Sequence, residues 1–178
     1  VQTCALPIFG SGHALVGIKG SLRVLELATA NPLPHVMARA KCHEFGESAL
    51  ERGGDRVVST KDHQAIVYRR STGARIGAAR FETEGSAVFV PGRDEILWLG
   101  RRELLLWTPS SGAARTLEVI GVHEAAVSSD ARRLALAFAD GRVALVDLDV
   151  MRTAMTPVKL GAATVADKCP SGDPFATG

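Results

Sequence analysis

The chain has few of the residues that stabilise small folds covalently or through metals. Its 178 residues include only three cysteines, Cys4, Cys42 and Cys169, which lie far apart and form no C-x-x-C pair. This spacing argues against a disulfide framework and against a structural zinc site. No apolar run reaches the length of about eighteen residues that a transmembrane helix needs. No basic segment followed by an apolar run marks a signal peptide, so the cytoplasm is the default location.

An excess of charge is also missing. The chain has 21 Lys and Arg against 19 Asp and Glu, a formal net charge of +2, which gives no reason to expect a nucleic acid or an anionic membrane as partner. A hydrophobic content of 46% and a charged content of 22% are typical of a globular protein. Sixteen arginines stand against five lysines, and Asn31 is the only asparagine. This bias is typical of a GC-rich genome and favours a bacterial source.

The common catalytic and cofactor motifs are absent. There is no G-x-S-x-G elbow, no H-E-x-x-H and no P-loop. Gly10-Ser11-Gly12 begins like a dinucleotide-binding loop, but the third glycine and a following helix are lacking, so a turn is the better interpretation. The sequence therefore predicts no cofactor, no metal and no catalytic residue.

The first eight residues, VQTCALPI, resemble the in-frame translation of a constant adapter used in short-read sequencing libraries. We expect residues 1–8 to be an artefact, to be set aside before the fold is considered. The natural N-terminus would then be missing, together with any targeting signal or further domain before Phe9. Residues 161–178 are interpreted as a tail or as the start of a further structural unit.

A twelve-residue pattern occurs four times in the chain, at residues 19–30, 62–73, 101–112 and 140–151. Its equivalent positions are Leu25, Tyr68, Trp107 and Val146, with a first spacing slightly longer than the two equal spacings that follow. A period near forty residues with short apolar segments is typical of repeat architectures.

Each repeat has the pattern of an antiparallel meander. In the third repeat, residues 87–90, 96–99, 104–107 and 114–119 are predicted strands, separated by turns rich in Gly, Pro and Ser. In the fourth repeat, 124–128, 134–138 and 142–147 are predicted strands, and Asp140-Gly141 is the strongest hairpin signal in the chain. The runs at 96–99 and 134–138 are continuously apolar, which indicates burial on both faces, as in small sheets stacked face to face.

These features predict an all-β fold of about four four-stranded antiparallel units, at residues 9–40, 46–83, 84–120 and 121–160. The repeats resemble those of the WD-repeat-like β-propellers. Residues 140–148 (DGRVALVDL) are similar to that family's Asp-Gly-x-Val-x-Leu-Trp-Asp-Leu hairpin, and Ser128-Ser129-Asp130 resembles its Ser-Pro-Asp-Gly turn. Val146 replaces the family's tryptophan, and only Asp147 keeps its aspartate, so the resemblance is to a divergent member.

The resemblance covers residues 10–160 and implies part of a propeller. It implies a non-enzymatic scaffold that binds a protein or peptide. A propeller-class enzyme, or the sensor or docking part of a larger signalling enzyme, is the alternative.

The His-Glu pairs His43-Glu44 and His123-Glu124 are the candidate binding residues. They would form metal or acid–base groups at a propeller mouth, or else each histidine would be bound to backbone at the entry of a repeat unit.

The aromatic residues Trp98 and Trp107 are predicted core residues, with a role as binding hot spots as the alternative. The strand order of a propeller would place the arginine doublets at 69–70 and 132–133 on one face and the doublet at 101–102 on the opposite face. We therefore expect the doublets to be solvated turn residues rather than one phosphate-binding patch.

Overall fold

The computed structural model describes residues 5–6, 13–18, 21–26, 38–39, 48–51, 53–61 and 63–163. These residues form four antiparallel sheets. Sheet 1 consists of β1 (Ala5–Leu6), β2 (His13–Ile18), β3 (Ser21–Glu26) and β4 (Ala38–Arg39). Sheet 2 consists of β5 (Ser48–Leu50), β6 (Arg56–Lys61), β7 (Gln64–Arg69) and β8 (Arg75–Arg80). Within sheet 1, β1 comes from the segment expected to be an artefact, and the adapter origin of that segment stays a prediction.

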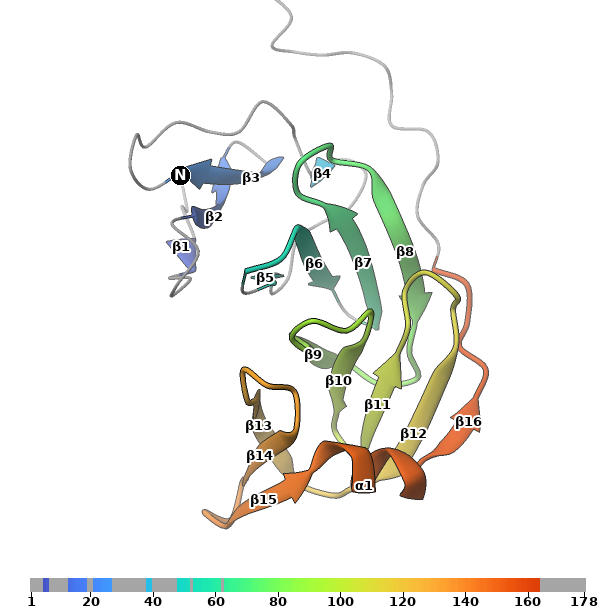
Figure 1. Ribbon diagram of the computed structural model, residues 1–178. Helices are drawn as coiled ribbons and strands as arrows, with labels where there is room; N and C mark the ends of the chain where they lie inside the picture. Colours follow the sequence, from blue (N-terminus) through green and yellow to red (C-terminus); the bar gives the residue numbers. More distant parts are fainter. Residues whose placement is uncertain are drawn as a thin grey trace, which may run out of the picture.

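The remaining strands build two further sheets. Sheet 3 contains β9 (Gly85–Phe89), β10 (Ile96–Gly100), β11 (Glu103–Trp107), β12 (Ala114–Glu118) and β16 (Thr156–Val158). Sheet 4 contains β13 (Val122–Val127), β14 (Arg133–Phe138) and β15 (Val143–Asp147), followed by the helix α1 (Leu148–Ala154). The sheets follow one another along an arc (Figure 1). The first strands β5, β9 and β13 lie on its inner side and contact one another in order, whereas β8, β12 and β16 lie on its outer side. The all-β fold with stacked meanders is confirmed.

Positive backbone angles in the turn between the first and second strands of sheets 2, 3 and 4 help to explain why the strands reverse there. Gly53 and Gly92 occupy equivalent positions in the β5–β6 and β9–β10 turns, with φ of 71° and 68°. In the β13–β14 turn the positive angle falls one position later, at Ala131 with φ 57°, a conformation that costs a non-glycine residue about 1–2 kcal/mol. The predicted Asp140-Gly141 hairpin is confirmed, with Gly141 at φ 85° between β14 and β15.

Sheet 4 differs from the expected four strands. Among the described residues it has three strands, because the chain continues after β15 as α1 and then adds β16 to the outer edge of sheet 3, antiparallel to β12. In sheets 2 and 3 the third strand is followed by a turn with Gly73 or Gly112 at φ 70° and 75°. The equivalent residue, Met151, disfavours a positive φ. Asp147 instead caps a helix, and its Oδ1 accepts hydrogen bonds from the amides of Asp149 and Val150.

The space between sheets 2 and 3 is filled by large aromatic side chains. Trp98 and Trp107 are fully buried there, so their predicted place in the core is confirmed. Phe81, in the connection between the two sheets, stacks on Trp98 with ring centroids 4.0 Å apart and meets Trp107 edge-on at 5.9 Å. Gly85 lets β9 pass this cluster, since a Cβ there would lie 2.7 Å from the Trp98 ring.

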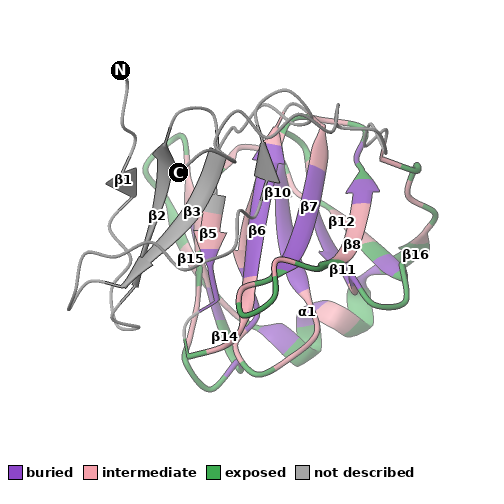
Figure 2. Cartoon of the chain, turned by 90° about the horizontal axis from the view of Figure 1, so that it is seen from above, coloured by how far each residue is buried: buried purple, intermediate pink, exposed green. Residues whose placement is uncertain are grey.

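Sheet 3 is covered on both faces. Ile96 and Trp98 of β10 pack toward sheet 2, whereas Leu97 and Leu99 pack toward sheet 4, and none is more than 7% exposed. The continuous apolar run of β10 is therefore explained by burial on two sides. The same expectation is wrong for β14, whose Leu134 and Leu136 face sheet 3 while the alternate residues Ala135 and Ala137 are half-buried on the other side. Figure 2 shows largely purple strands β6 and β7 in sheet 2, whereas β15 of sheet 4 has only exposed and intermediate residues.

Candidate functional site

Of the two predicted His-Glu pairs, the structure describes only His123 and Glu124, because His43 and Glu44 lie outside the described residues. His123 and Glu124 are exposed at the start of β13, where the pairing with β14 shifts between Val122 and Glu124 and leaves His123 without a paired residue. Glu124 lies opposite Ala137 in this ladder and on the side of sheet 4 that faces away from sheet 3. The described part of the chain holds no group of three or more His, Cys, Asp or Glu side chains arranged to hold a metal ion. That the two His-Glu pairs come together at a propeller mouth stays a prediction.

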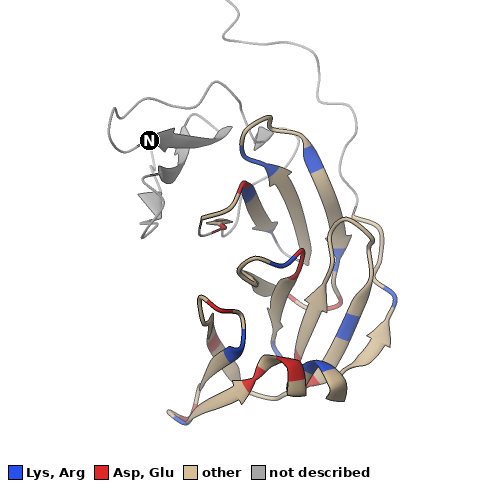
Figure 3. Cartoon of the chain, viewed as in Figure 1, with Lys and Arg blue, Asp and Glu red and all other residues tan. Residues whose placement is uncertain are grey.

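A different set of side chains meets at one edge of the stacked sheets, which we call the turn face. It consists of the described residues of the β5–β6 turn, 51 and 53–55, of the turns at 70–74, 90–95, 108–113 and 128–132, and of α1. In an antiparallel meander the first and third turns lie at the same end of the sheet. Acidic and basic residues alternate along this face from sheet 2 to α1 (Figure 3).

Within each of sheets 2 and 3, an aspartate joins the first turn to the third. Asp55 accepts hydrogen bonds from the amide and the hydroxyl of Ser71, the former at 2.8 Å. Asp94, at the position equivalent to Asp55 in the next repeat, accepts one from the amide of Ser110 at 3.3 Å. In sheet 4 the corresponding link is made by backbone, since the amide of Leu148 in α1 donates to the carbonyl of Arg132 at 2.8 Å. The turns of each sheet are thereby fixed relative to one another.

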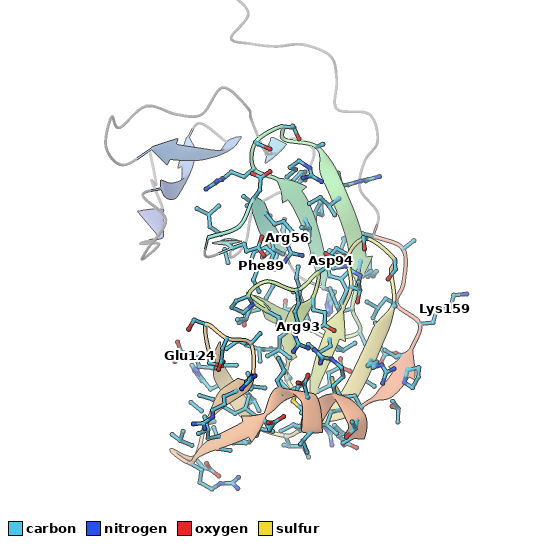
Figure 4. All side chains as sticks on the ribbon, in the orientation of Figure 1. Arg56, Phe89, Arg93, Asp94, Glu124 and Lys159 are labelled. Carbon is cyan, nitrogen blue, oxygen red and sulfur yellow. The ribbon has the colours of Figure 1, made fainter. Side chains whose placement is uncertain are left out.

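Arg56 joins sheet 2 to sheet 3. Its guanidinium donates to both carboxylate oxygens of Glu51, Nε to Oε2 at 3.0 Å and Nη2 to Oε1 at 2.6 Å. Nη1 donates to Oδ1 of Asp94 at 2.7 Å, and Nη2 also donates to the carbonyl of Arg93. The guanidinium lies 5.2 Å from the centre of the Phe89 ring, which contributes a cation–π contact. Figure 4 shows Arg56, Phe89 and Asp94 together in the middle of the molecule, with Glu124 and Lys159 on opposite sides.

Burial makes the Arg56–Glu51 pair more than a surface ion pair. The two side chains are 13% and 9% exposed, whereas Asp94 is 38% exposed. The hydrogen bonds with Glu51 raise the pKa of Arg56 above its ordinary value, and the charges of Glu51 and Asp94 add to this against the opposing effect of burial. Arg56 is therefore a permanent cation fixed between two sheets.

Sheet 3 is joined to α1 by two further arginines. Arg93 of the β9–β10 turn donates to Oδ1 of Asp149 at 3.1 Å. Arg152 of α1 donates to Glu95 and to Asp149. The Arg152 and Glu95 side chains are 22% and 21% exposed, so this contact is partly shielded from water. Together with Arg56, these pairs connect the turns of sheets 2 and 3 with α1 into one charged surface.

The arginine doublets lie at the ends of the sheets where the order of the strands was expected to place them. Arg70 and Arg132 belong to the turn face, next to Arg69 at the end of β7 and Arg133 at the start of β14. Residues 101–102 lie in the β10–β11 turn at the opposite end of the sheets. Arg132 and Arg102 are both exposed, one on each face. The doublets therefore do not form one continuous basic patch.

A groove of about 620 Å³ lies between the outer edges of sheets 2 and 3. Arg80, Lys159 and Glu103 are among its lining residues, beside the apolar Phe81 and Leu160. Glu103 accepts hydrogen bonds from Thr83 and Thr116, each at 3.3 Å. The groove is bridged where Arg80 of β8 exchanges two backbone hydrogen bonds with Gly161, at 3.0 and 3.1 Å. Its lining of both charge signs suits a polar peptide better than an apolar small molecule.

Sequence reasoning missed Arg56, although one signal for its surroundings was available. Asp55 and Asp94 occupy equivalent turn positions in successive repeats, as do Ser71 and Ser110. Acidic and hydroxyl residues repeated at turns indicate a structural link. Arg56 itself has no equivalent in the next repeat, where Glu95 stands at the corresponding position. No periodic pattern could therefore reveal it.

Solved structures resemble the chain in fold. It matches a chain of the Mitotic Checkpoint Complex at 17% identity and a TM-score of 0.56, over 76% of this chain and 45% of that one. It matches the C-terminal WD40 domain of Sif2 at 19% identity and a TM-score of 0.56, over 85% and 44%. The β-propeller domain of Cps50 (Swd1) from Myceliophteria thermophila matches at 14% identity and a TM-score of 0.63, over 90% and 56%. No sequence model of a known family and no curated protein matches.

The chain thus has the fold of part of a β-propeller, and its structural neighbours are WD40 propeller domains. It spans about half the length of these solved chains. No helix within the described ranges is long and apolar enough to cross a membrane.

Proposed function

We propose that the chain is a non-enzymatic interaction scaffold that binds a protein or peptide partner across its turn face. The observation that carries this proposal is the set of arginine–carboxylate contacts that connect sheets 2 and 3 and the helix α1 at that face. Arg56 bridges to Asp94, and Arg93 bridges to Asp149. A surface whose turns are already ordered loses less conformational entropy when it binds, so more of its contact energy appears as affinity.

The turn face also has the chemistry of a selective protein contact. Its buried arginine, Arg56, is occupied by two carboxylates, while exposed groups such as Arg132 and Asp130 remain in water. Exposed charges of this kind steer association and discriminate between partners more than they add affinity. A partner with both acidic and basic groups fits the face better than a polyanion such as nucleic acid, whose recognition needs a continuous basic stripe.

The structural neighbours support a protein-binding role by analogy alone. One of them is a chain of the Mitotic Checkpoint Complex, an assembly of proteins. Because the chain spans about half of these neighbours, the partner of the whole protein is part of the proposal. The proposal also includes a bacterial source, supported by the arginine-rich composition. It further includes an incomplete ring, supported by the partial coverage of the solved propeller domains.

A peptide selection with two matched charge reversals tests the proposal. Peptides displayed on phage are selected against the immobilised chain, and the affinity of each enriched peptide is measured against Arg132→Glu and Arg102→Glu. Both residues are exposed, so neither reversal should unfold the chain by more than about 0.5 kcal/mol. We expect Arg132→Glu to weaken binding about tenfold or more and Arg102→Glu to leave it unchanged.

Two results would contradict the proposal. The first is that no peptide is enriched over an unrelated globular protein of the same charge. The second is that the enriched peptides are weakened by Arg102→Glu and not by Arg132→Glu, which would move binding to the opposite face. Thermal unfolding of both variants, compared with the wild type, shows that each difference concerns binding and not stability.

A further inference from the structure

The groove between the outer edges of sheets 2 and 3 holds charges of opposite sign that do not neutralise one another. Glu103 and Arg80 both line this groove of about 620 Å³. The carboxylate of Glu103 contacts only two hydroxyl groups among the described residues, and the guanidinium of Arg80 has no described carboxylate as partner. Both groups are therefore available to bind a charged group of a ligand.

Two threonines hold the carboxylate of Glu103 in the groove. Glu103 is the first residue of β11 and lies on the same side of that strand as Leu105, which packs toward sheet 2. Its Oε1 accepts a hydrogen bond from the hydroxyl of Thr83 and its Oε2 accepts one from the hydroxyl of Thr116, each at 3.3 Å. These distances are long for hydrogen bonds to a carboxylate, and both donors are neutral. The half-buried carboxylate therefore favours a stronger, positively charged donor such as an ammonium group.

One wall of the groove is fixed at both of its ends. Residues 158–161 form this wall. At one end Val158 of β16 lies opposite Ala114 of β12, and at the other end Gly161 exchanges two backbone hydrogen bonds with Arg80. A groove whose wall is already held loses little conformational entropy when a ligand binds, so more of the contact energy appears as affinity.

Apolar side chains line the groove beside these charges. Phe81 and Leu105 are only 3% and 2% exposed, yet both belong to the lining. Val158 and Leu160 are half-buried and pack against the same core cluster as these two residues. The groove therefore offers an apolar contact surface next to a carboxylate and a guanidinium, and apolar walls with a few polar groups are typical of ligand sites.

We infer that this groove binds a short peptide with free termini and apolar side chains. Glu103 binds the ammonium group of the peptide, and Arg80 binds its carboxylate. Phe81 and Leu160 contact an apolar side chain of the peptide. The groove volume of about 620 Å³ lies within the range of about 300–1,000 Å³ that is usual for small-ligand sites. Because the groove lies at the outer edges of the sheets, this site does not depend on the proposed function of the turn face.

Isothermal titration calorimetry of the full chain with the dipeptide leucyl-leucine tests the inference. We expect the chain to bind the dipeptide, and the affinity to fall about tenfold or more when the amine is acetylated or the carboxylate is converted to an amide. Glu103→Gln should weaken binding of the free dipeptide by a similar factor and leave the affinity for the acetylated form unchanged. Arg80→Met should weaken binding of the free dipeptide likewise and leave the affinity for the amide form unchanged.

Two variants with the same changes of charge are the matched controls. Glu82→Gln and Lys159→Met alter exposed residues that also line the groove. The side chain of Lys159 extends away from the sheets (Figure 4). Each control should change the dissociation constant for leucyl-leucine by less than about threefold, because exposed charges contribute little to a contact.

Three results would overturn the inference. Absence of binding at millimolar concentrations of leucyl-leucine would show that the groove is not a peptide site. Equal affinities for the free, acetylated and amide forms would show that the termini are not recognised. Losses for the two controls as large as those for Glu103→Gln and Arg80→Met would attribute binding to net charge and not to these two groups. Matching unfolding curves for the wild type, Glu103→Gln and Arg80→Met would attribute their loss of affinity to the site itself.

Discussion

Replacing Arg56 by methionine should be among the most destabilising changes of a charged residue in this chain. Methionine keeps much of the aliphatic length of arginine but removes the guanidinium, and with it the contacts to Glu51 and Asp94. Glu51 is 9% exposed, so its carboxylate would remain buried without its cation. Breaking a buried ion pair by removal of one partner typically costs about 3–5 kcal/mol.

The other contacts of Arg56 change this value little. Asp94 is 38% exposed and regains water when Arg56 is lost, so its share is at most about 1 kcal/mol. The contact with the Phe89 ring at 5.2 Å contributes about 0.5–1 kcal/mol. We therefore expect Arg56→Met to lower the free energy of unfolding by about 3–5 kcal/mol, a large part of the total for a domain of ordinary stability.

Urea unfolding followed by the fluorescence of the buried Trp98 and Trp107 measures this loss. Arg142→Met is the control, because the Arg142–Asp140 pair has a similar 2.7 Å contact but side chains that are 72% and 54% exposed. It should cost less than about 1 kcal/mol. The double variant Arg56→Met, Glu51→Leu should recover at least about 1 kcal/mol relative to Arg56→Met, since no unpaired charge is then buried. A loss below about 1 kcal/mol for Arg56→Met, or no recovery in the double variant, would refute this reasoning.

Three further predictions concern single positions. Gly92→Ala should lower the free energy of unfolding by about 1–2 kcal/mol in urea, because Gly92 has φ 68° with open space around it, and an unchanged midpoint would count against the turn geometry. Trp98→Ala should cost about 3–5 kcal/mol by removing a fully buried ring stacked on Phe81, and a loss below about 1 kcal/mol would show that this core is not formed. The hydrogen bond from Arg93 lowers the pKa of Asp149 below the ordinary pKa of an aspartate. Asp149 therefore contributes to stability at every pH above that ordinary pKa, and this contribution is lost as the pH falls through the lowered pKa of the folded protein. Asp149→Asn should therefore make unfolding less dependent on pH in the acid range, and equal acid profiles for variant and wild type would contradict the contact.

Local features of the sequence were sufficient to predict most of the fold. Turns with glycine at equivalent positions and short apolar strands predicted the meanders, because both depend on neighbouring residues. The continuous run of β10 correctly indicated a strand buried on both faces, since Ile96–Gly100 are all buried. The equally apolar run of β14 did not, because burial depends on a neighbouring sheet and not on the strand itself.

The end of the chain shows where the prediction failed. Residues after Asp147 were expected to complete a fourth strand of the same sheet, by analogy with the earlier repeats. The loss of a glycine at Met151 and the capping side chain of Asp147 allow a helix there instead. The attachment of β16 to sheet 3 is a contact between segments far apart in the sequence, which no local pattern indicates. The Arg56–Asp94 contact was missed for the same reason, since its partners belong to different repeats.

The proposed binding face can be tested most directly by nuclear magnetic resonance. Backbone amide shifts of the isotope-labelled chain are recorded while a selected peptide is added, and the shifted residues are mapped on the structure. The account predicts that the largest shifts occur in the turns at 51–55, 90–95 and 128–132 and in α1. The largest shifts at the opposite end of the sheets, around 100–103 and 139–142, would contradict the proposal that the turn face is the binding surface.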